Sequence, residues 1–320
     1  MGSVSSLTAA ITAQTEKVVV GKTRQIHLII MALLAEGHVL LDDLPGVGKT
    51  TLVKTLARAT GCDTRRIQFV PDLMPADIIG MNIFDQHSAG FRLLPGPVMT
   101  NLLLADEINR AIPRTQAALL EAMEEKQVTI DGDTLPLPDP FIVMATQNPV
   151  ESETTFRLPA AQMDRFLVRL TMGYPSREEE LAMLGALGDV IPFDTVESVT
   201  GPEALVAAQV LVRQVQLAPA LAQYLLDLTR RTREHPLVRI GASPRASRAL
   251  YKAAKAWAAM QGRDFVIPDD VQELAVPVLA HRLLLSGEAR LSGRTAETII
   301  TELLAALPVP PCAEDILHAK

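Results

Sequence analysis

The feature that most restricts the fold is the segment LPGVGKTT at residues 44–51, which follows a short apolar stretch and opens a run with helical spacing. In a strand–loop–helix arrangement of this kind, glycines let backbone N–H groups surround phosphate oxygens, and the helix N-terminus favours negative charge. The segment therefore predicts a phosphate-binding loop. Its expected nucleotide contacts are Pro45, Gly46, Val47, Gly48, Lys49, Thr50 and Thr51.

Two side chains of this loop have specific expected roles. Lys49 would neutralise charge on the β- and γ-phosphates, and the Thr50 hydroxyl would bind Mg²⁺, so ATP and Mg²⁺ are the expected cofactors. The strict GxxxxGKT pattern requires a glycine where this chain has Asp43. Gly46 and Gly48 remain, and these are the glycines that matter most for surrounding the phosphates.

Acidic and polar residues end two later apolar segments. Asp106 and Glu107 follow residues 102–105, and Asn148 follows residues 141–146. Beside a phosphate-binding loop, Asp106 can hold Mg²⁺ through water, Glu107 can polarise the attacking water as general base, and Asn148 can orient that water. Because nucleotide binding alone does not require Glu107, the pattern favours hydrolysis.

Arg165, in the segment LPAAQMDRF, is a candidate arginine finger. A guanidinium at this position does not easily reach its own phosphate loop but could complete the site of a neighbouring subunit. The alternative is an ordinary surface ion pair between Asp164 and Arg165. The sequence also leaves open whether another arginine supplies this group; the other candidates are Arg157, Arg110 and Arg114.

Arg245 lies at the start of a predicted helix, just after an N-cap at Ser243 and a first-turn Pro244. From there it could contact the γ-phosphate and couple the nucleotide state to the angle of a second domain. The alternative is an ordinary exposed helix arginine.

Short apolar segments alternate with helical patterns over the first half of the chain. The predicted strands are residues 38–42, 67–70, 101–106, 141–146 and 165–170. This alternation is typical of an α/β fold with a parallel five-stranded sheet covered on both faces. Strand signals nearly vanish after residue 177, so we expect an α/β domain over residues 1–176 and an all-helical domain over residues 177–320.

Two insertions interrupt the α/β part. Residues 71–97 are too long for a plain connection between strands. Residues 127–135 contain Asp131-Gly132, a dipeptide typical of a tight β-hairpin.

The composition excludes several classes of protein. With 48% apolar and 21% charged residues the chain is not mostly disordered, and a net charge of −7 predicts no broad basic face for duplex DNA. No apolar run approaches the roughly 20 residues that span a bilayer, and the N-terminus lacks a secretory signal. We therefore expect a cytoplasmic protein without membrane insertion.

The amino-acid sequences of these segments resemble those of the MoxR family of AAA+ ATPases. The resemblance rests on GHVLLDDLPGVGKTTL (37–52), RIQFVPDLMPADIIG (66–80), residues 96–132, FIVMATQNPVE (141–151) and LPAAQMDRFLVRL (158–170), and more loosely on GASPRAS (241–247). Asp43 in place of glycine is familiar in that family. The chain departs from the family at residues 154–157, where TTFR replaces a glycine and an aromatic residue.

The resemblance implies an AAA+ core of three layers, αβα, with a helix-2 insert near residues 81–94, a pre-sensor-1 β-hairpin at residues 127–135, and a helical lid domain. In the terms of that family, Asp106-Glu107 is Walker B, Asn148 is sensor 1 and Arg245 is sensor 2. It also places three residues near the adenine, namely Val19, Val20 and Gly21.

The resemblance further implies a function. The family forms rings, expected here to be hexamers, with ATP bound at the subunit interfaces. Its members are thought to act as chaperones on protein clients, in the maturation of enzyme complexes or the insertion of their cofactors, often beside a partner with a von Willebrand factor A domain.

Two other functions remain open at the level of sequence. A nucleic-acid-dependent AAA+ motor is disfavoured by the acidic balance and by the lack of a recognisable nucleic-acid-binding module. A nucleotide-gated scaffold with little turnover is disfavoured because Glu107, Asn148 and Arg165 are all present.

Overall fold

A five-stranded sheet lies at the centre of the molecule, in a computed structural model that describes residues 2–42, 46–87, 89–148, 156–178, 180–181 and 192–311. The strand order is β2-β5-β8-β1-β9, and every neighbouring pair is parallel. The strands are β1 (His38–Asp42), β2 (Thr64–Gln68), β5 (Leu102–Asp106), β8 (Ile142–Gln147) and β9 (Phe166–Leu170). The predicted parallel sheet is confirmed, with β2 at residues 64–68 rather than 67–70.

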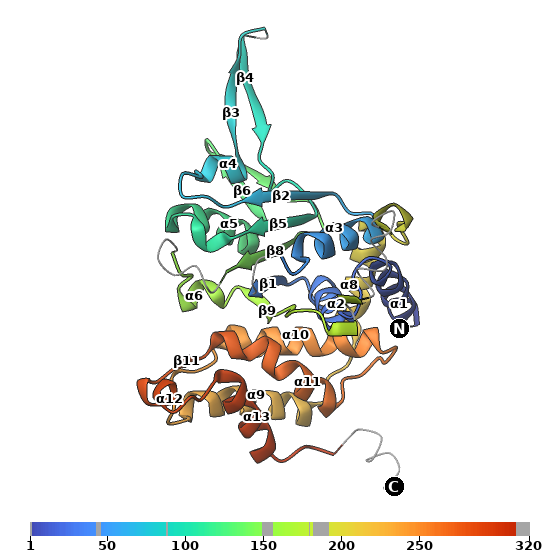
Figure 1. Cartoon of the computed structure of the whole chain (residues 1–320), viewed down its shortest axis with the longest axis vertical. Coiled ribbons are helices and arrows are strands. Elements are labelled where there is room, and N and C mark those ends of the chain that lie inside the picture. The colour runs from blue at the N-terminus through green and yellow to red at the C-terminus, as the bar shows by residue number, and fades with distance from the viewer. Residues whose placement is uncertain are drawn as a thin grey trace.

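Helices cover both faces of this sheet. Successive residues of a strand point to opposite sides, and accordingly Leu102 and Leu104 of β5 pack in one hydrophobic cluster while Leu103 and Ala105 pack in another. The first cluster includes side chains of α1 (Gly2–Glu16), α2 (Thr23–Leu34) and α3 (Lys49–Thr60), and the second includes those of α5 (Pro113–Glu125). The result is the expected αβα arrangement (Figure 1).

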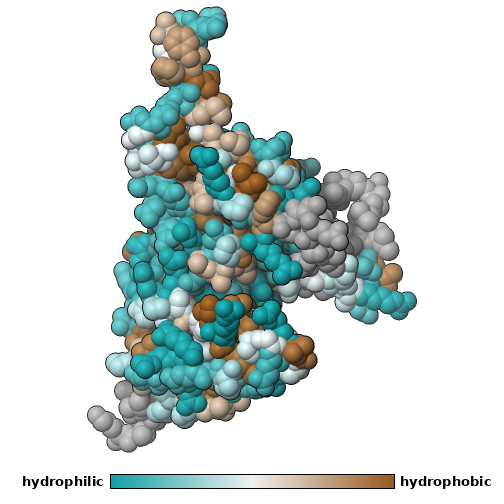
Figure 2. Space-filling view, turned by 90° about the vertical axis from the view of Figure 1, so that its left-hand side faces the viewer, coloured by the Kyte–Doolittle hydropathy of each residue, from teal (hydrophilic) through white to brown (hydrophobic). Residues whose placement is uncertain are grey.

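The first insertion forms a hairpin that projects from the body of the molecule (Figure 1). It follows α4 (Pro75–Ile79) and consists of the antiparallel strands β3 (Gly80–Asp85) and β4 (Gly90–Pro95). Large apolar side chains on it are exposed, as Figure 2 shows at its upper end; they belong to Met81, Phe84, Phe91, Leu93 and Leu94.

The second insertion is the hairpin predicted from Asp131-Gly132. Strands β6 (Gln127–Ile130) and β7 (Asp133–Pro136) pair antiparallel directly after α5. Asp131 and Gly132 both have positive φ, at 51° and 97°, as a tight turn with a left-handed backbone requires.

The second half of the chain is mainly helical. Its longer helices are α8 (Pro202–Gln214), α9 (Pro219–Glu234), α10 (Pro244–Met260), α11 (Pro268–Leu279) and α13 (Ala296–Ala306), with a shorter α12 (Gly287–Leu291). Shorter still in this half are η2 (Pro192–Thr195) and η3 (Ala280–Arg282), and the first half contains the short elements η1 (Ile108–Arg110) and α6 (Ala160–Met163). Four of the longer helices, α8 to α11, begin with proline. Proline lacks a backbone N–H, but an N–H in the first turn would have no partner within the helix.

One feature of this half was not predicted. Strands β10 (Val238–Ile240) and β11 (Leu284–Leu285) form a small antiparallel ribbon. The expectation of an all-helical domain was therefore wrong in this detail. The sequence did not show the two strands because, at three and two residues, they are too short to produce a visible alternation of apolar and polar residues.

The two halves share one hydrophobic cluster, which extends from the sheet through α2 to α10 and α11. Helix α10 packs against α2, α8 and α11, and α11 packs against β9. None of the helices in the described part of the chain combines the length and the apolarity that crossing a bilayer requires.

Candidate functional site

The phosphate loop joins β1 to α3, as the sequence predicts. Gly46 and Gly48 have φ values of 84° and 83°, in the left-handed region that glycine tolerates, and Gly48 immediately precedes α3. With this conformation the loop backbone and the first turn of the 12-residue α3 can point their N–H groups toward a bound phosphate. Pro45, like Asp43, lies outside the described residues.

A pocket of about 360 Å³ opens beside this loop. The carboxyl ends of β2, β5 and β8 meet here because parallel strands end at the same edge of a sheet. It is lined by Gly46, Gly48, Lys49, Thr50, Thr51, Arg66, Gln68, Asp106, Glu107, Thr146 and Asn148. The structure thus brings the predicted lysine, threonines, acids and asparagine to one place.

The two acids at the end of β5 are linked through Thr146 of β8. The Thr146 hydroxyl donates to Asp106 Oδ1 at 2.8 Å and accepts from the Glu107 N–H at 2.9 Å. Glu107 has a left-handed backbone, with φ 56° and ψ 49°, which is uncommon for a residue with a side chain and is often found at functional sites.

Both carboxylates also bind polar side chains from the same pocket or next to it. Arg66 Nε donates to Asp106 Oδ2 at 2.8 Å, and Glu107 Oε2 accepts from Gln68 Nε2 at 2.6 Å and from Arg110 Nη1 at 2.8 Å. Arg110, an alternative candidate for the trans arginine, therefore pairs with the acid of its own chain.

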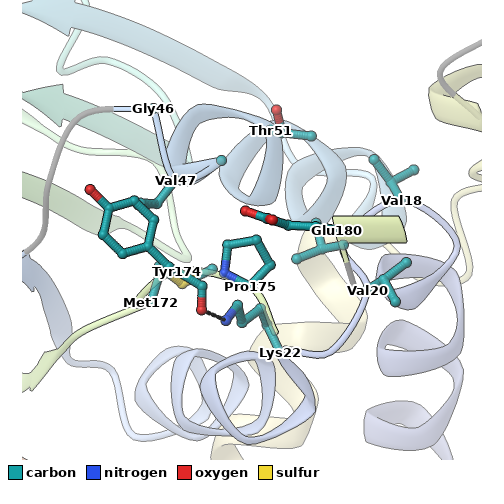
Figure 3. A pocket seen from close by; sticks show the side chains of 12 residues that line it. Val18, Val20, Lys22, Gly46, Val47, Thr51, Met172, Tyr174, Pro175 and Glu180 are labelled. Atoms are coloured by element: carbon teal, nitrogen blue, oxygen red, sulfur yellow. Dashed lines mark hydrogen bonds between the residues drawn. The ribbon is translucent and has the colours of Figure 1, made fainter. Parts of the chain in front are cut away.

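A second pocket, of about 540 Å³, lies on the other side of the loop and shares Gly46, Gly48 and Thr51 with the first. Figure 3 shows Val18 and Val20 on one side of it and Tyr174 on the other, with Pro175 between them. Lys22 Nζ donates to the Tyr174 carbonyl at 3.3 Å. The mostly apolar lining suits a planar base.

Of the three residues expected near the adenine, Val19 and Val20 line this second pocket. Gly21 is not among the lining residues; its φ of 74° instead forms the turn between α1 and α2. Met172, Tyr174, Pro175 and Glu180 were not predicted, because nothing local in the sequence shows that residues beyond β9 return to the loop.

The oxygen donors of the first pocket fit Mg²⁺. Thr50 and Asp106 provide a hydroxyl and a carboxylate beside the loop, and hard cations of this size prefer oxygen ligands. Within the described residues no three His, Cys, Asp or Glu side chains gather as a metal site. This donor set fits a metal held by one or two protein oxygens together with the phosphates of a nucleotide.

Arg165 and Arg245 lie away from both pockets and share one carboxylate. Arg165 Nε is 3.2 Å from Glu124 Oε2, and Arg245 Nη2 pairs with Glu124 Oε1. In this structure α10 begins next to residue 164, and its first arginine, Arg245, pairs with Glu124 of α5; its expected contact with the γ-phosphate stays a prediction.

Asp164 explains why the two arginines lie together. Its Oδ2 accepts from the Ser243 hydroxyl, the N-cap of α10, at 2.7 Å, and its Oδ1 accepts from Arg282 Nε at 2.7 Å. Arg282 is buried, which lowers its pKa, while the Asp164 carboxylate opposes that effect. The alternative interpretation of Arg165, a surface pair with Asp164, is not what the structure has: Asp164 pairs with Arg282, and Arg165 pairs with Glu124.

Comparison with known proteins identifies the family. The model of the ATPase family associated with various cellular activities (AAA) matches residues 38–168, and that of the AAA lid domain matches residues 230–303. The chain is 41% identical to the chaperone MoxR1 of Mycobacterium tuberculosis, covering 93% of this chain and 81% of that protein. The chain belongs to the MoxR family of AAA+ ATPases.

Two other proteins are similar to this chain over nearly their whole length. Protein YeaC of Bacillus subtilis, which is uncharacterized, is 51% identical, with 92% of each chain covered. A crystal structure of a candidate ATPase from Cytophaga hutchinsonii has a TM-score of 0.90 and 37% identity, with 96% of each chain covered. The fold is thus shared with that ATPase along nearly the whole chain.

Proposed function

We propose that this MoxR-family chain binds Mg²⁺·ATP in the two joined pockets and hydrolyses it. The observation that carries the proposal is the convergence of Lys49, Thr50, Asp106, Glu107 and Asn148 on one pocket beside the phosphate loop. The larger apolar pocket next to it has room for the base and the ribose.

Each side chain has a defined task in this proposal. Lys49 neutralises the β- and γ-phosphates, and Thr50 and Asp106 hold the metal, which supplies charge neutralisation when bound. Glu107 orients and deprotonates the attacking water, and Asn148 fixes the position of that water. The Thr146 hydroxyl bonds both acidic residues and so fixes their positions relative to each other.

We propose that the active form is a ring, in which Arg165 completes the site of the next subunit. Support comes from the place of Arg165 and Arg245, which share Glu124 and line neither pocket of their own chain. In a head-to-tail ring the two arginines would reach a neighbouring site together, and Arg245 would act there rather than in its own chain. A hexamer is the expected ring size.

The lid would transmit the nucleotide state. We assign residues 1–176 to the AAA+ core and residues 177–320 to the lid, because β9 ends the sheet and the matched lid domain lies wholly in the second part. The Asp164 junction joins the end of the core to both α10 and η3.

The work performed is proposed to be chaperone-like remodelling of a protein client, with a von Willebrand factor A domain protein as partner. The name of MoxR1 supports the first part. The hairpin β3–β4 has the exposed apolar side chains that contact with a client requires (Figure 2).

Turnover and assembly mass, measured together for the parent, Glu107→Gln and Arg165→Ala, test this proposal. Removal of a general base costs about 10²–10⁴-fold in rate, and removal of an arginine finger about 10³–10⁵-fold. Both variants should still bind ATP. Arg157→Ala and Arg114→Ala, both at exposed positions, test the other candidates for the trans arginine and should keep turnover if Arg165 supplies that group.

Mixing the two inactive variants separates action in trans from action in cis. In a randomly mixed ring about a quarter of the head-to-tail interfaces combine an intact Glu107 with an intact Arg165. Recovery of turnover on mixing is therefore expected. No recovery, in a mixture shown by mass to co-assemble, would refute the shared site.

A further inference from the structure

Two side chains of the edge strand β2 lie over the acids of the neighbouring strand. Arg66 and Gln68 are two residues apart and so point to the same face. The parallel register places Gln68 opposite Asp106. Both side chains line the phosphate pocket together with Lys49 and Thr50.

Every oxygen of the Asp106 carboxylate is engaged. Oδ1 accepts from Thr146, and Oδ2 accepts from Arg66 Nε at 2.8 Å. The Asp106 side chain is only 10% exposed, whereas that of Arg66 is 50% exposed. The guanidinium therefore covers the carboxylate oxygen on the side that faces the pocket.

The same guanidinium is connected to the general base. Arg66 Nη2 donates to Gln68 Oε1 at 2.8 Å, and Gln68 Nε2 donates to Glu107 Oε2 at 2.6 Å. Arg66 thus orients the amide that in turn holds Glu107.

A hydrated metal ion that binds Asp106 would need Oδ2, the same oxygen that the guanidinium of Arg66 occupies. They would also repel each other, because both are positive and would lie within a few ångströms in a partly buried pocket. We propose that Arg66 is a positioning residue that stands in for the metal on Asp106 and is displaced when Mg²⁺·nucleotide binds. This rests on the function proposed above.

Displacement of Arg66 has a consequence for Glu107. When the guanidinium leaves Asp106 Oδ2, the amide of Gln68 loses the donor that fixes its orientation, and its hold on Glu107 weakens. The arrival of the metal and the release of the base are thereby linked through residues of a single strand.

Equilibrium binding of a fluorescent ADP analogue to the full chain, with Mg²⁺ and with EDTA, tests this proposal without relying on turnover. The quantity compared is the ratio of the Kd in EDTA to the Kd in Mg²⁺. Arg66→Gln removes the competing cation, and Arg65→Gln, an exposed neighbour on the opposite face of β2, removes the same charge as a matched control. Any loss of general attraction for phosphate affects both Kd values and cancels in the ratio.

The ratio should rise by about two- to fivefold in Arg66→Gln, as expected for loss of a half-exposed competing ion pair, and should stay at the parental value in Arg65→Gln. An unchanged or smaller ratio in Arg66→Gln, with a parental melting temperature, overturns the proposal; a smaller ratio would mean that Arg66 presents Asp106 to the metal. A parent whose ADP affinity does not depend on Mg²⁺ would also overturn this inference, while turnover of the parent tests the proposed ATPase function separately.

Discussion

Replacement of Arg282 by methionine tests how the core is joined to the lid. The Arg282 side chain is 2% exposed. Its Nε donates to Asp164 Oδ1 at 2.7 Å, and Nη2 donates to the carbonyl oxygens of Phe166 at 2.6 Å and Asp164 at 3.2 Å. Nη1 donates to Leu167 O at 3.2 Å and also to Val278 O.

The expected cost follows from what the substitution leaves behind. Methionine fills much of the volume but donates no hydrogen bond, so the Asp164 carboxylate, 16% exposed, loses its cation and several buried carbonyl groups lose their donors. Removing one partner of a buried ion pair costs about 3–5 kcal/mol of unfolding free energy. The double variant Arg282→Met/Asp164→Asn should regain about 1–2 kcal/mol, because no uncompensated charge remains.

Urea unfolding gives the measurement, with Trp257 fluorescence and far-UV circular dichroism recorded on the same samples. Trp257, the single tryptophan, lies on α10 against His27, with 6.4 Å between ring centroids, and so reports on the region between core and lid. Arg294→Met, which breaks the exposed Arg294–Glu302 pair, is the matched control and should cost no more than about 1 kcal/mol. A loss below about 1 kcal/mol in Arg282→Met would refute the assigned role of the junction.

Two further predictions concern stability. Burial lowers the pKa of His38 to about 4, so the native ring stays neutral where the unfolded ring, with a pKa near 6.5, takes up a proton. His38 alone should therefore lower the free energy of unfolding by roughly 3 kcal/mol between pH 7 and pH 4. The urea midpoint of His38→Gln should fall less steeply with decreasing pH than that of the parent. Gly96→Ala places a methyl group against backbone atoms of Ile78 and Gly80 and should cost about 1–3 kcal/mol in a thermal melt. Gly201→Ala has open space and should stay within about 0.5 kcal/mol, so equal losses would contradict the steric argument.

Much of the fold could be predicted from local patterns. Buried parallel strands read as apolar runs, and the turn at Asp131-Gly132 needs a left-handed backbone, so each feature is visible within a few residues. The family resemblance then supplied the AAA+ family and its helical lid, which the comparisons confirm.

The details of the candidate site were harder to predict. The strand β2 was predicted three residues too late, which left Arg66 outside it, and the roles of Gln68, Thr146 and Glu124 had no local signal at all. These residues act through partners 39 to 121 positions away, and only sheet order and register bring such partners together.

The sequence by itself determined that this chain is an αβα P-loop protein of the MoxR family with Lys49, Thr50, Asp106, Glu107 and Asn148 as its candidate chemical groups, because those features depend on short motifs and strand patterns. Only the tertiary structure decided what holds these groups: Arg66 on Asp106, Gln68 and Arg110 on Glu107, and Arg165 and Arg245 together on Glu124. The physical reason is that hydrogen bonds and ion pairs act over about 3 Å in space, whereas the residues that make them are set beside each other by the packing of the whole domain.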